Sequence, residues 1–292
     1  MITQEILKKV RRIEIRTSKF VNDIFAGEYE SVFKGHGLEF AEVREYQPGD
    51  DVRTIDWKVT ARMRRLYVRK YQEERELTVM LVVDASRSVD FGFAQMKRDV
   101  ATEICALLAF SAIKNNDKVG LIVFTNRVEK FVPPRKGRKH VLRVIRDLLE
   151  FSPEETRTNI AGALEYLNRV VRRHAVVFLV SDFSATGFEK DLRVSHRRHD
   201  VIALTIQDPA ERSLPELNCF IEWEDAETGE VFVADTADPE VRQRFDINVG
   251  TRERERQRLF RSMHVDYIDI TTGQSYLEPL VRFFRERARR FR

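Results

Sequence analysis

Five largely apolar segments, each the length of one strand, constrain the fold more than any other feature of the sequence. They cover residues 77–84, 118–125, 175–182, 201–207 and 265–271. Such segments are typical of parallel strands that are buried on both faces of a sheet. Helical patterns long enough for crossover connections lie between them, at 94–114, 139–150, 160–173 and 188–196. This alternation predicts a doubly wound α/β fold with a mainly parallel sheet.

Two further features complete the C-terminal part of the chain. Phe220–Glu224 and Val231–Ala234 have strand-like patterns, and Glu227, Thr228 and Gly229 join them, so we expect a hairpin inserted late in the fold. Helical patterns then cover about 239–263 and 276–290.

The first 76 residues have a different character. Apolar residues at spacings of three, four and seven predict an amphipathic helix over about 3–26. Short alternating segments broken by glycine and proline follow up to residue 76 and predict a small antiparallel sheet. We therefore expect two domains, with the helix and β appendage in 1–76 and the α/β domain in 77–292.

The composition excludes several classes of protein. Hydrophobic residues make up 42% and glycine and proline are few, at 12 and 8, so the chain is neither collagen-like nor disordered. Lys and Arg number 51 against 47 Asp and Glu, and this near balance does not by itself indicate a nucleic-acid-binding protein. No apolar run approaches the roughly 18 residues of a membrane helix. We expect a cytoplasmic protein with no membrane partner.

Carboxylate and hydroxyl side chains stand where three of the predicted segments meet one edge of the sheet. Asp84, Ser86 and Ser88 follow the first core strand, Asp182 follows the third, and Thr158 directly precedes a helix. Ligands of open α/β sheets bind at the carboxyl ends of the strands. Five oxygen donors on one edge suit a hard cation such as Mg²⁺ or Mn²⁺.

These residues resemble the metal-ion-dependent adhesion site of von Willebrand factor type A domains, over about 77–272. The resemblance implies that one divalent cation is bound, directly or through water, by Asp84, Ser86, Ser88, Thr158 and Asp182.

Alternatives to this site remain open at the level of sequence. Asn159 stands where many members of that family have aspartate, and Thr156 is a rival for the role of Thr158. Asp-x-Ser-x-Ser alone is also typical of a capped turn before a helix.

A second match lies upstream, at 35–40, 44–58 and 61–62. It resembles the domain-of-unknown-function 58 family, prokaryotic proteins in which such a segment precedes a von Willebrand A-like domain. The resemblance implies a partnership with MoxR-type AAA+ ATPases in assembling or activating other proteins. In the same segment charged residues interleave with apolar ones, at Arg44, Tyr46, Arg53, Ile55, Asp56, Trp57 and Arg62. We expect a buried or half-buried ion-pair network in which Arg53 and Asp56 are structural, and a partner-binding surface is the alternative.

Together these observations predict a metal-dependent protein-interaction module with no catalytic residue and no organic cofactor. Its open coordination position would accept an acidic side chain of an ATPase or client protein. A Mg²⁺-dependent phosphatase or nuclease is the first alternative, but Ser86 stands where a second aspartate would be expected and no lysine or histidine adjoins the motif in sequence. A nucleic-acid-binding module is the second, because 282–292 holds six arginines and one glutamate.

Overall fold

A computed structural model of the chain describes residues 4–20, 29, 32, 38–73, 76–92, 95–214, 217–224 and 229–290. The chain forms two compact units. The appendage comprises residues 33–77, and the sheet unit comprises 1–32 together with 78–292. The N-terminal helix therefore belongs with the sheet unit, and its predicted place in one domain with the appendage was wrong.

The sheet unit contains a six-stranded sheet in the order β10-β7-β6-β3-β4-β5. Its strands are β3 (Thr78–Asp84), β4 (Lys118–Phe124), β5 (Val128–Arg135), β6 (Val176–Ser181), β7 (Asp200–Gln207) and β10 (Asp266–Thr271). All neighbours pair in parallel except β4 and β5, which are antiparallel. Counted along the chain, the strand order is 3-2-1-4-5-6, the order of a doubly wound fold. The predicted fold class is confirmed.

Strand β5 is absent from the sequence prediction. It carries Pro133 and Pro134, which argue against a strand in the middle of a sheet because proline cannot donate a hydrogen bond. The structure places β5 at the edge, paired only with β4, where this loss is tolerated.

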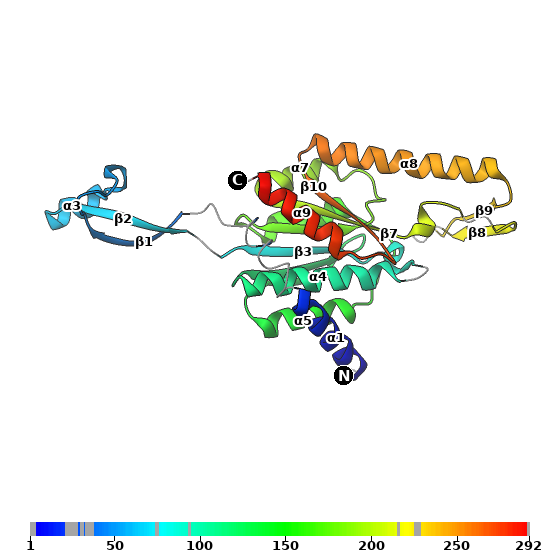
Figure 1. Ribbon diagram of the computed structural model, residues 1–292, viewed down its shortest axis with the longest axis horizontal. Coiled ribbons are helices and arrows are strands. Elements are labelled where there is room, and N and C mark those ends of the chain that lie inside the picture. Colours follow the sequence, from blue (N-terminus) through cyan, green and yellow to red (C-terminus); the bar gives the residue numbers. More distant parts are fainter. Residues whose placement is uncertain are drawn as a thin grey trace. The chain divides into compact units, whose positions relative to one another are not determined.

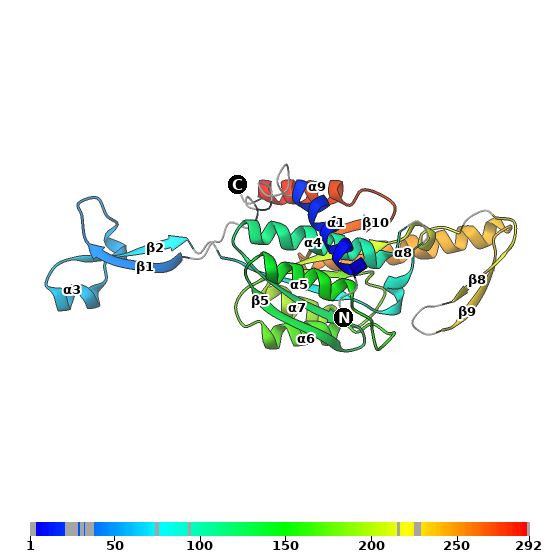
Figure 2. The ribbon, with the colours of Figure 1, turned by 90° about the horizontal axis from the view of Figure 1, so that it is seen from below.

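Helices cover both faces of the sheet (Figures 1 and 2). One face carries α4 (Lys97–Lys114), α5 (Arg138–Leu149) and α9 (Leu277–Arg290), and the other carries α6 (Ile160–Val170), α7 (Glu189–Arg198) and α8 (Pro239–Ser262). Because side chains alternate along a strand, Met80 and Val82 of β3 enter the cluster formed with Leu164, Leu192 and Phe260 from the second group of helices. Both faces of the central strands are thus buried, as the apolar segments predict.

Helix α1 (Gln4–Phe20) packs on the outer side of α4 and α5. Arg16 pairs with Glu103 of α4 at 3.1 Å, and Glu14 pairs with Arg138 of α5 at 2.6 Å. Val10 is buried beside them. The amphipathic stripe predicted from the sequence therefore explains why the helix joins the sheet unit. The predicted continuation to residue 26 lies outside the described residues.

The appendage contains β1 (Leu38–Glu45) and β2 (Tyr67–Glu73), which pair antiparallel as predicted. Of the predicted strand at 31–34, only Val32 is among the described residues, and it is helical and buried. Between β1 and β2 stand η2 (Val52–Thr54) and α3 (Trp57–Met63), and the sequence analysis missed α3. Asp56 caps α3 by accepting hydrogen bonds from the backbone N–H groups of Lys58 and Val59.

The predicted hairpin is confirmed as β8 (Phe220–Glu224) and β9 (Val231–Asp235), a separate antiparallel pair. It follows η4 (Pro209–Glu211) at the carboxyl end of β7. Trp223 contacts Phe91 and Phe245, with ring centroids 6.2 and 6.3 Å apart. Among the described residues, no helix is both long enough and apolar enough to cross a membrane.

Candidate functional site

The candidate site lies where the order of strands reverses, between β3 and β6. Asp84 is the last residue of β3, and Asp182 comes directly after β6. Connections leave the sheet toward opposite faces at such a switch point, which opens a crevice at the carboxyl ends of the strands. Both carboxylates therefore stand at the position where doubly wound proteins bind ligands.

Asp84 is only 2% exposed and is held from both sides. Its Oδ1 accepts a hydrogen bond from the backbone N–H of Ser86 at 2.9 Å, and its Oδ2 accepts one from the hydroxyl of Ser181 at 2.7 Å. The hydroxyls of Ser86 and Ser88 lie 2.9 Å apart. The loop after β3, which includes η3 (Arg87–Asp90), thus presents two hydroxyls beside the carboxylate.

Asp182 is positioned by a strained turn. Phe183, the next residue, adopts the left-handed conformation with φ of 56°, which is unusual for a bulky residue. Its ring packs on Phe188 and Phe260, at centroid distances of 5.9 and 5.1 Å. Packing of this aromatic side chain therefore helps to hold the turn that places Asp182.

Thr158 stands in the loop before α6, half-buried. Two backbone hydrogen bonds attach this loop to the neighbouring strand ends, from Arg87 to Thr156 at 3.1 Å and from Asn159 to Thr125 at 2.8 Å. Asn159 also caps α6 by accepting from the N–H of Gly162. The structure thus joins the Thr158 loop to the loop that carries Ser86 and Ser88.

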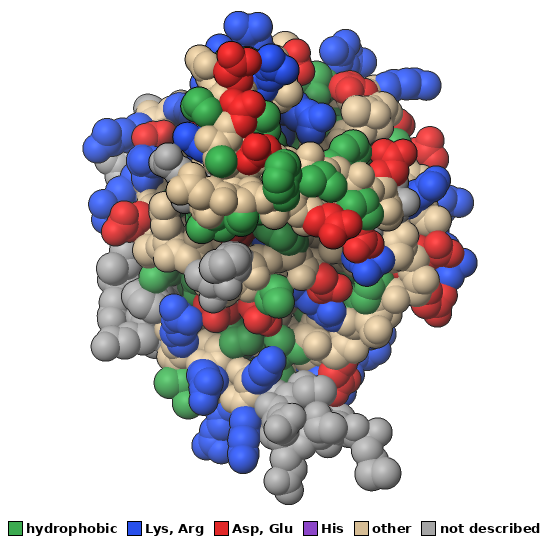
Figure 3. Space-filling view, turned by 90° about the vertical axis from the view of Figure 1, so that its right-hand side faces the viewer, with side chains coloured by type: hydrophobic (Ala, Val, Ile, Leu, Met, Phe, Trp, Pro, Cys, Tyr) green, Lys and Arg blue, Asp and Glu red, His purple; other side chains and the backbone are tan. Residues whose placement is uncertain are grey.

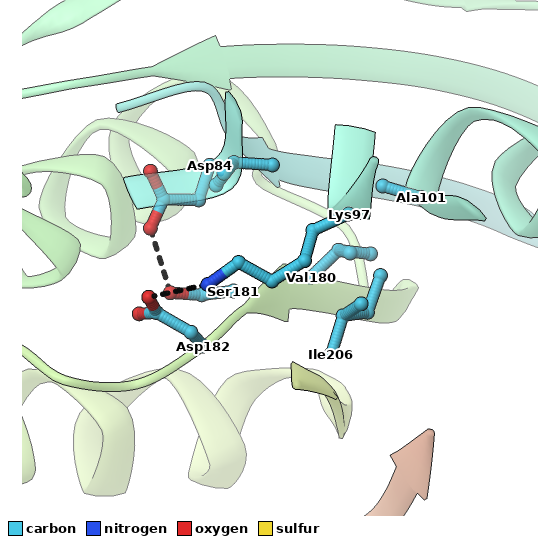
Figure 4. Close-up of a pocket in the computed structure, with 8 residues that line it drawn as sticks. Asp84, Lys97, Ala101, Val180, Ser181, Asp182 and Ile206 are labelled. Carbon is cyan, nitrogen blue, oxygen red and sulfur yellow. Dashed lines mark hydrogen bonds and ion pairs between the residues drawn. The ribbon is translucent and has the colours of Figure 1, made fainter. Parts of the chain in front are cut away.

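Lys97 is the residue of this site that the sequence analysis missed. It is the first residue of α4 and only 1% exposed, and its Nζ lies 3.4 Å from Oδ2 of Asp182 (Figure 4). The same Nζ lies 2.6 Å from Oε1 of Glu211. The expectation that no lysine adjoins the motif holds only along the sequence and is wrong in space. No sequence signal marks Lys97, because its partners stand 85 and 114 positions further along.

The charged groups at the site shift one another's pKa values. Burial, and next the negative charge of Asp182, raise the pKa of Asp84 to about 7. Burial alone would lower the pKa of Lys97, but Asp182 and Glu211 outweigh it and the pKa is raised. Lys97 pairs with two of the three carboxylates, Asp182 and Glu211, so the fully ionised site has an excess of negative charge.

A small cavity adjoins the two carboxylates. Its lining combines the polar residues Asp84, Lys97, Ser181 and Asp182 with the apolar residues Val89, Ala101, Val180 and Ile206, and its volume of about 10 Å³ is roughly the space of one water molecule. Within the described part of the chain, no group of three or more His, Cys, Asp or Glu residues could hold a metal. A site with two carboxylates and several hydroxyls matches Mg²⁺ or Mn²⁺ better than a metal that prefers thiolate or imidazole.

In the appendage, Asp56 is structural, but its partner is not Arg53. Asp56 is buried and accepts a hydrogen bond from Nε of Arg69 at 2.8 Å. This hydrogen bond, and next the one from the backbone of Val59, hold the pKa of Asp56 below its ordinary value. The predicted ion-pair network is therefore confirmed for Asp56 and for the half-buried Arg44.

Three of the predicted residues are exposed instead. Arg53 and Arg62 are exposed, and the side chain of Trp57 is 67% exposed. Arg44 pairs with Asp50 at 2.6 Å, within the turn between β1 and η2. The expectation that Arg53 is structural was wrong, because its side chain is exposed on η2 and has no partner among the described residues.

The C-terminal helix is anchored more deeply than its composition suggests. Phe283 and Phe284 are buried, and so is Arg287, which pairs with Asp266 at 3.0 Å and also with Asp200. Arg290 pairs with Asp266 as well. Arg287 and Arg290 thus pair with aspartates of β7 and β10.

The fold and the site define a doubly wound α/β protein with an acidic, hydroxyl-rich site at its switch point. Residues 42–256 match the family model described as "Protein of unknown function DUF58", and the chain belongs to this family. An uncharacterised protein of Mycobacterium tuberculosis is 32% identical over 284 residues, which cover 96% of this chain and 89% of that protein.

Two solved structures are similar in fold. The hypothetical protein BatB of Bacteroides thetaiotaomicron is 17% identical, with a TM-score of 0.47, over 73% of this chain and 99% of that one. The VWA domain of SpRpn10 is 11% identical, with a TM-score of 0.38, over 70% of this chain and 93% of that one. The family assignment rests on the sequence match, and the fold class rests on the strand order of the chain itself.

Proposed function

We propose that this protein is a metal-dependent protein-interaction module. In the proposal, Asp84, Ser86, Ser88, Thr158 and Asp182 bind one Mg²⁺ or Mn²⁺ at the edge between β3 and β6. A partner protein completes the coordination with an acidic side chain. The pair of buried carboxylates on adjacent strands, Asp84 and Asp182, is the observation that carries the proposal.

The site leaves room for a partner's carboxylate in the coordination of the cation. Lys97 pairs with both Asp182 and Glu211, so these carboxylates are already partly engaged. A divalent cation held mainly by Asp84 and by neutral hydroxyls would keep a coordination position for an oxygen anion of another protein. The partner that we propose is a MoxR-type AAA+ ATPase or its client, with this chain as the adaptor.

Lys97 gives no support to the enzymatic alternative. A general base needs access to a substrate and an unprotonated form near neutral pH. Lys97 is buried, its pKa is raised, and two carboxylates hold its ammonium group. The nucleic-acid-binding alternative is weakened in turn, because Arg287 and Arg290 pair with aspartates of the sheet unit.

The experiment is a binding assay with the purified MoxR-type ATPase of the same organism. Binding should occur in Mg²⁺, be lost in chelator, and be lost in Asp84→Ala. The matched control is Asp246→Ala, which removes an exposed carboxylate from α8 and should bind as the wild type does. Binding that persists in chelator, or phosphoesterase activity of the chain alone, would contradict the proposal.

A further inference from the structure

The exposed hydrophobic side chains of the protein gather in two segments. Thirteen large hydrophobic residues are strongly exposed among those that the structure describes. Four of them lie at 52–66 in the appendage and five lie at 217–233 in and before the hairpin. Contiguous exposed apolar residues mark interaction surfaces.

The first of these surfaces is the Trp57 face of the appendage, formed by Trp57, Lys58, Ala61 and Arg62, which share one side of α3 at helical spacing. Trp57 is 67% exposed, and α3 has no buried residue. Nothing within the described residues binds the side chains of Lys58 or Arg62, whereas Asp56 is engaged by Arg69. The positively charged side chains of this face are therefore exposed to solvent, whereas the nearby carboxylate of Asp56 is paired within the appendage.

The second surface is the hairpin face, formed by Phe220, Glu222, Glu224, Val231 and Val233. The register places these side chains on one side of the two-stranded sheet, because Glu222 is opposite Val233 and Glu224 is opposite Val231. Phe220 and Val233 are 73% and 67% exposed. Trp223 lies on the other side, against Phe91 and Phe245. The hairpin thus packs on the sheet unit through Trp223 and leaves Phe220, Glu222, Val231 and Val233 exposed, whereas Glu224 pairs with Arg87 and Phe232 on the Trp223 side is 56% exposed.

The two surfaces are opposite in charge. Residues 52–70 contain seven lysines and arginines and one aspartate, whereas 217–240 contain eight aspartates and glutamates and no lysine or arginine. On the end of the sheet unit seen in Figure 3, hydrophobic and acidic side chains lie together toward the middle and Lys and Arg gather mainly at the rim. Each surface therefore offers the apolar and electrostatic complement of the other.

We infer that the Trp57 face of one molecule docks on the hairpin face of a second copy of this chain. Trp57 would be the apolar anchor, and Lys58 and Arg62 would meet Glu222 and Glu224. Tryptophan and arginine are the residue types that most often dominate interface energies. Such a contact joins two different surfaces, so it generates chains or rings of molecules.

Charge complementarity favours a second copy as the occupant, because every molecule of this chain carries both the cationic face and the acidic one.

Sedimentation velocity of the full chain over a series of concentrations tests the inference. Wild type should exceed the mass of one chain as its concentration rises, and added NaCl should weaken the association. Trp57→Ala and Phe220→Ala should each weaken it by about tenfold or more. Asp84→Ala should associate as the wild type does, so failure of the metal site and failure of this contact are distinguishable.

Reversing the charges on each surface in turn is the decisive experiment. Lys58→Glu with Arg62→Glu, and separately Glu222→Lys with Glu224→Lys, should each abolish self-association, and an equimolar mixture of the two variants should restore it. Restoration also shows that both variants are folded. Arg172→Glu with Arg173→Glu is the matched control, because it reverses two exposed cations elsewhere and should not change the association.

Three results would overturn the inference. The first is a wild type that stays monomeric at every concentration, as docking within one chain would produce. The second is a mixture of charge-reversed variants that remains monomeric. The third is a monomeric chain that binds phosphatidylglycerol vesicles through Trp57, which would assign this face to an anionic membrane.

Discussion

The ammonium group of Lys97 lies 3.4 Å from Oδ2 of Asp182 and so places a positive charge inside the acidic switch point. The same group lies 2.6 Å from Glu211, and it therefore ties the end of β6 to η4. Asp208 at the start of η4 accepts a hydrogen bond from Thr272 after β10. The cation that holds the candidate site together thus belongs to a network over three strand ends.

Replacing Lys97 by methionine should destabilise the fold by about 3 kcal/mol, because it leaves buried carboxylates without their counter-ion. Mg²⁺ should raise the melting temperature of Lys97→Met more than that of the wild type, since a bound cation would replace the missing charge. Thermal unfolding with and without Mg²⁺ measures both effects. Lys139→Met, at an exposed position, is the control, and an equal response to Mg²⁺ in all three proteins would contradict the prediction.

Replacing Asp84 by alanine should abolish divalent-cation binding while the fold persists. Burial next to Asp182 makes ionisation of Asp84 unfavourable, so the variant loses a metal ligand without losing a favourable ion pair. Calorimetric titration with Mg²⁺ and Mn²⁺ measures the affinity, and circular dichroism checks the fold. Equal affinities in Asp84→Ala and wild type would exclude this site.

Replacing Asp56 by alanine should loosen the appendage, because it removes both the cap of α3 and the partner of Arg69. Arg53→Ala should have little effect, since that side chain is exposed. Hydrogen exchange of the backbone of α3 and β2 measures the change, and protection of the sheet unit should stay constant. Equal protection of α3 in Asp56→Ala and wild type would show that the cap contributes nothing.

His199 should make the protein less stable in mild acid. Burial, and next the charges of Arg198 and His174, lower the pKa of His199 to about 4, and neither ring nitrogen has a hydrogen-bond partner among the described residues. The unfolded chain, with a pKa near 6.5, then binds the proton more readily than the folded one. Stability is full above about pH 6.5 and falls as the pH drops toward 4.

Denaturant unfolding at pH 7 and pH 5 measures this loss of stability. In His199→Phe the difference between the two pH values should be smaller than in wild type. The exposed His174 offers the matched control, and His174→Phe should leave most of the pH dependence in place. A pH dependence that is unchanged in His199→Phe would assign it to another group.

The core strands could be predicted from the sequence because the apolar pattern that identifies a buried strand lies within a few neighbouring residues. Unbroken apolar segments identify strands that are buried on both faces, and the positions of Asp84 and Asp182 at strand ends follow from those segments alone. A parallel sheet then brings all its carboxyl ends to one edge, whatever the details of packing. The fold class and the positions of these two carboxylates could therefore be predicted from the sequence.

The tertiary structure decided whatever depends on distant parts of the chain. Lys97 joins the site because α4 crosses the sheet in front of Asp182 and Glu211, and no local pattern encodes that approach. The same holds for Trp57: an apolar residue in a short segment has the same pattern whether it is buried or exposed. Burial and pairing are properties of neighbours in space, and the sequence by itself determines only neighbours along the chain.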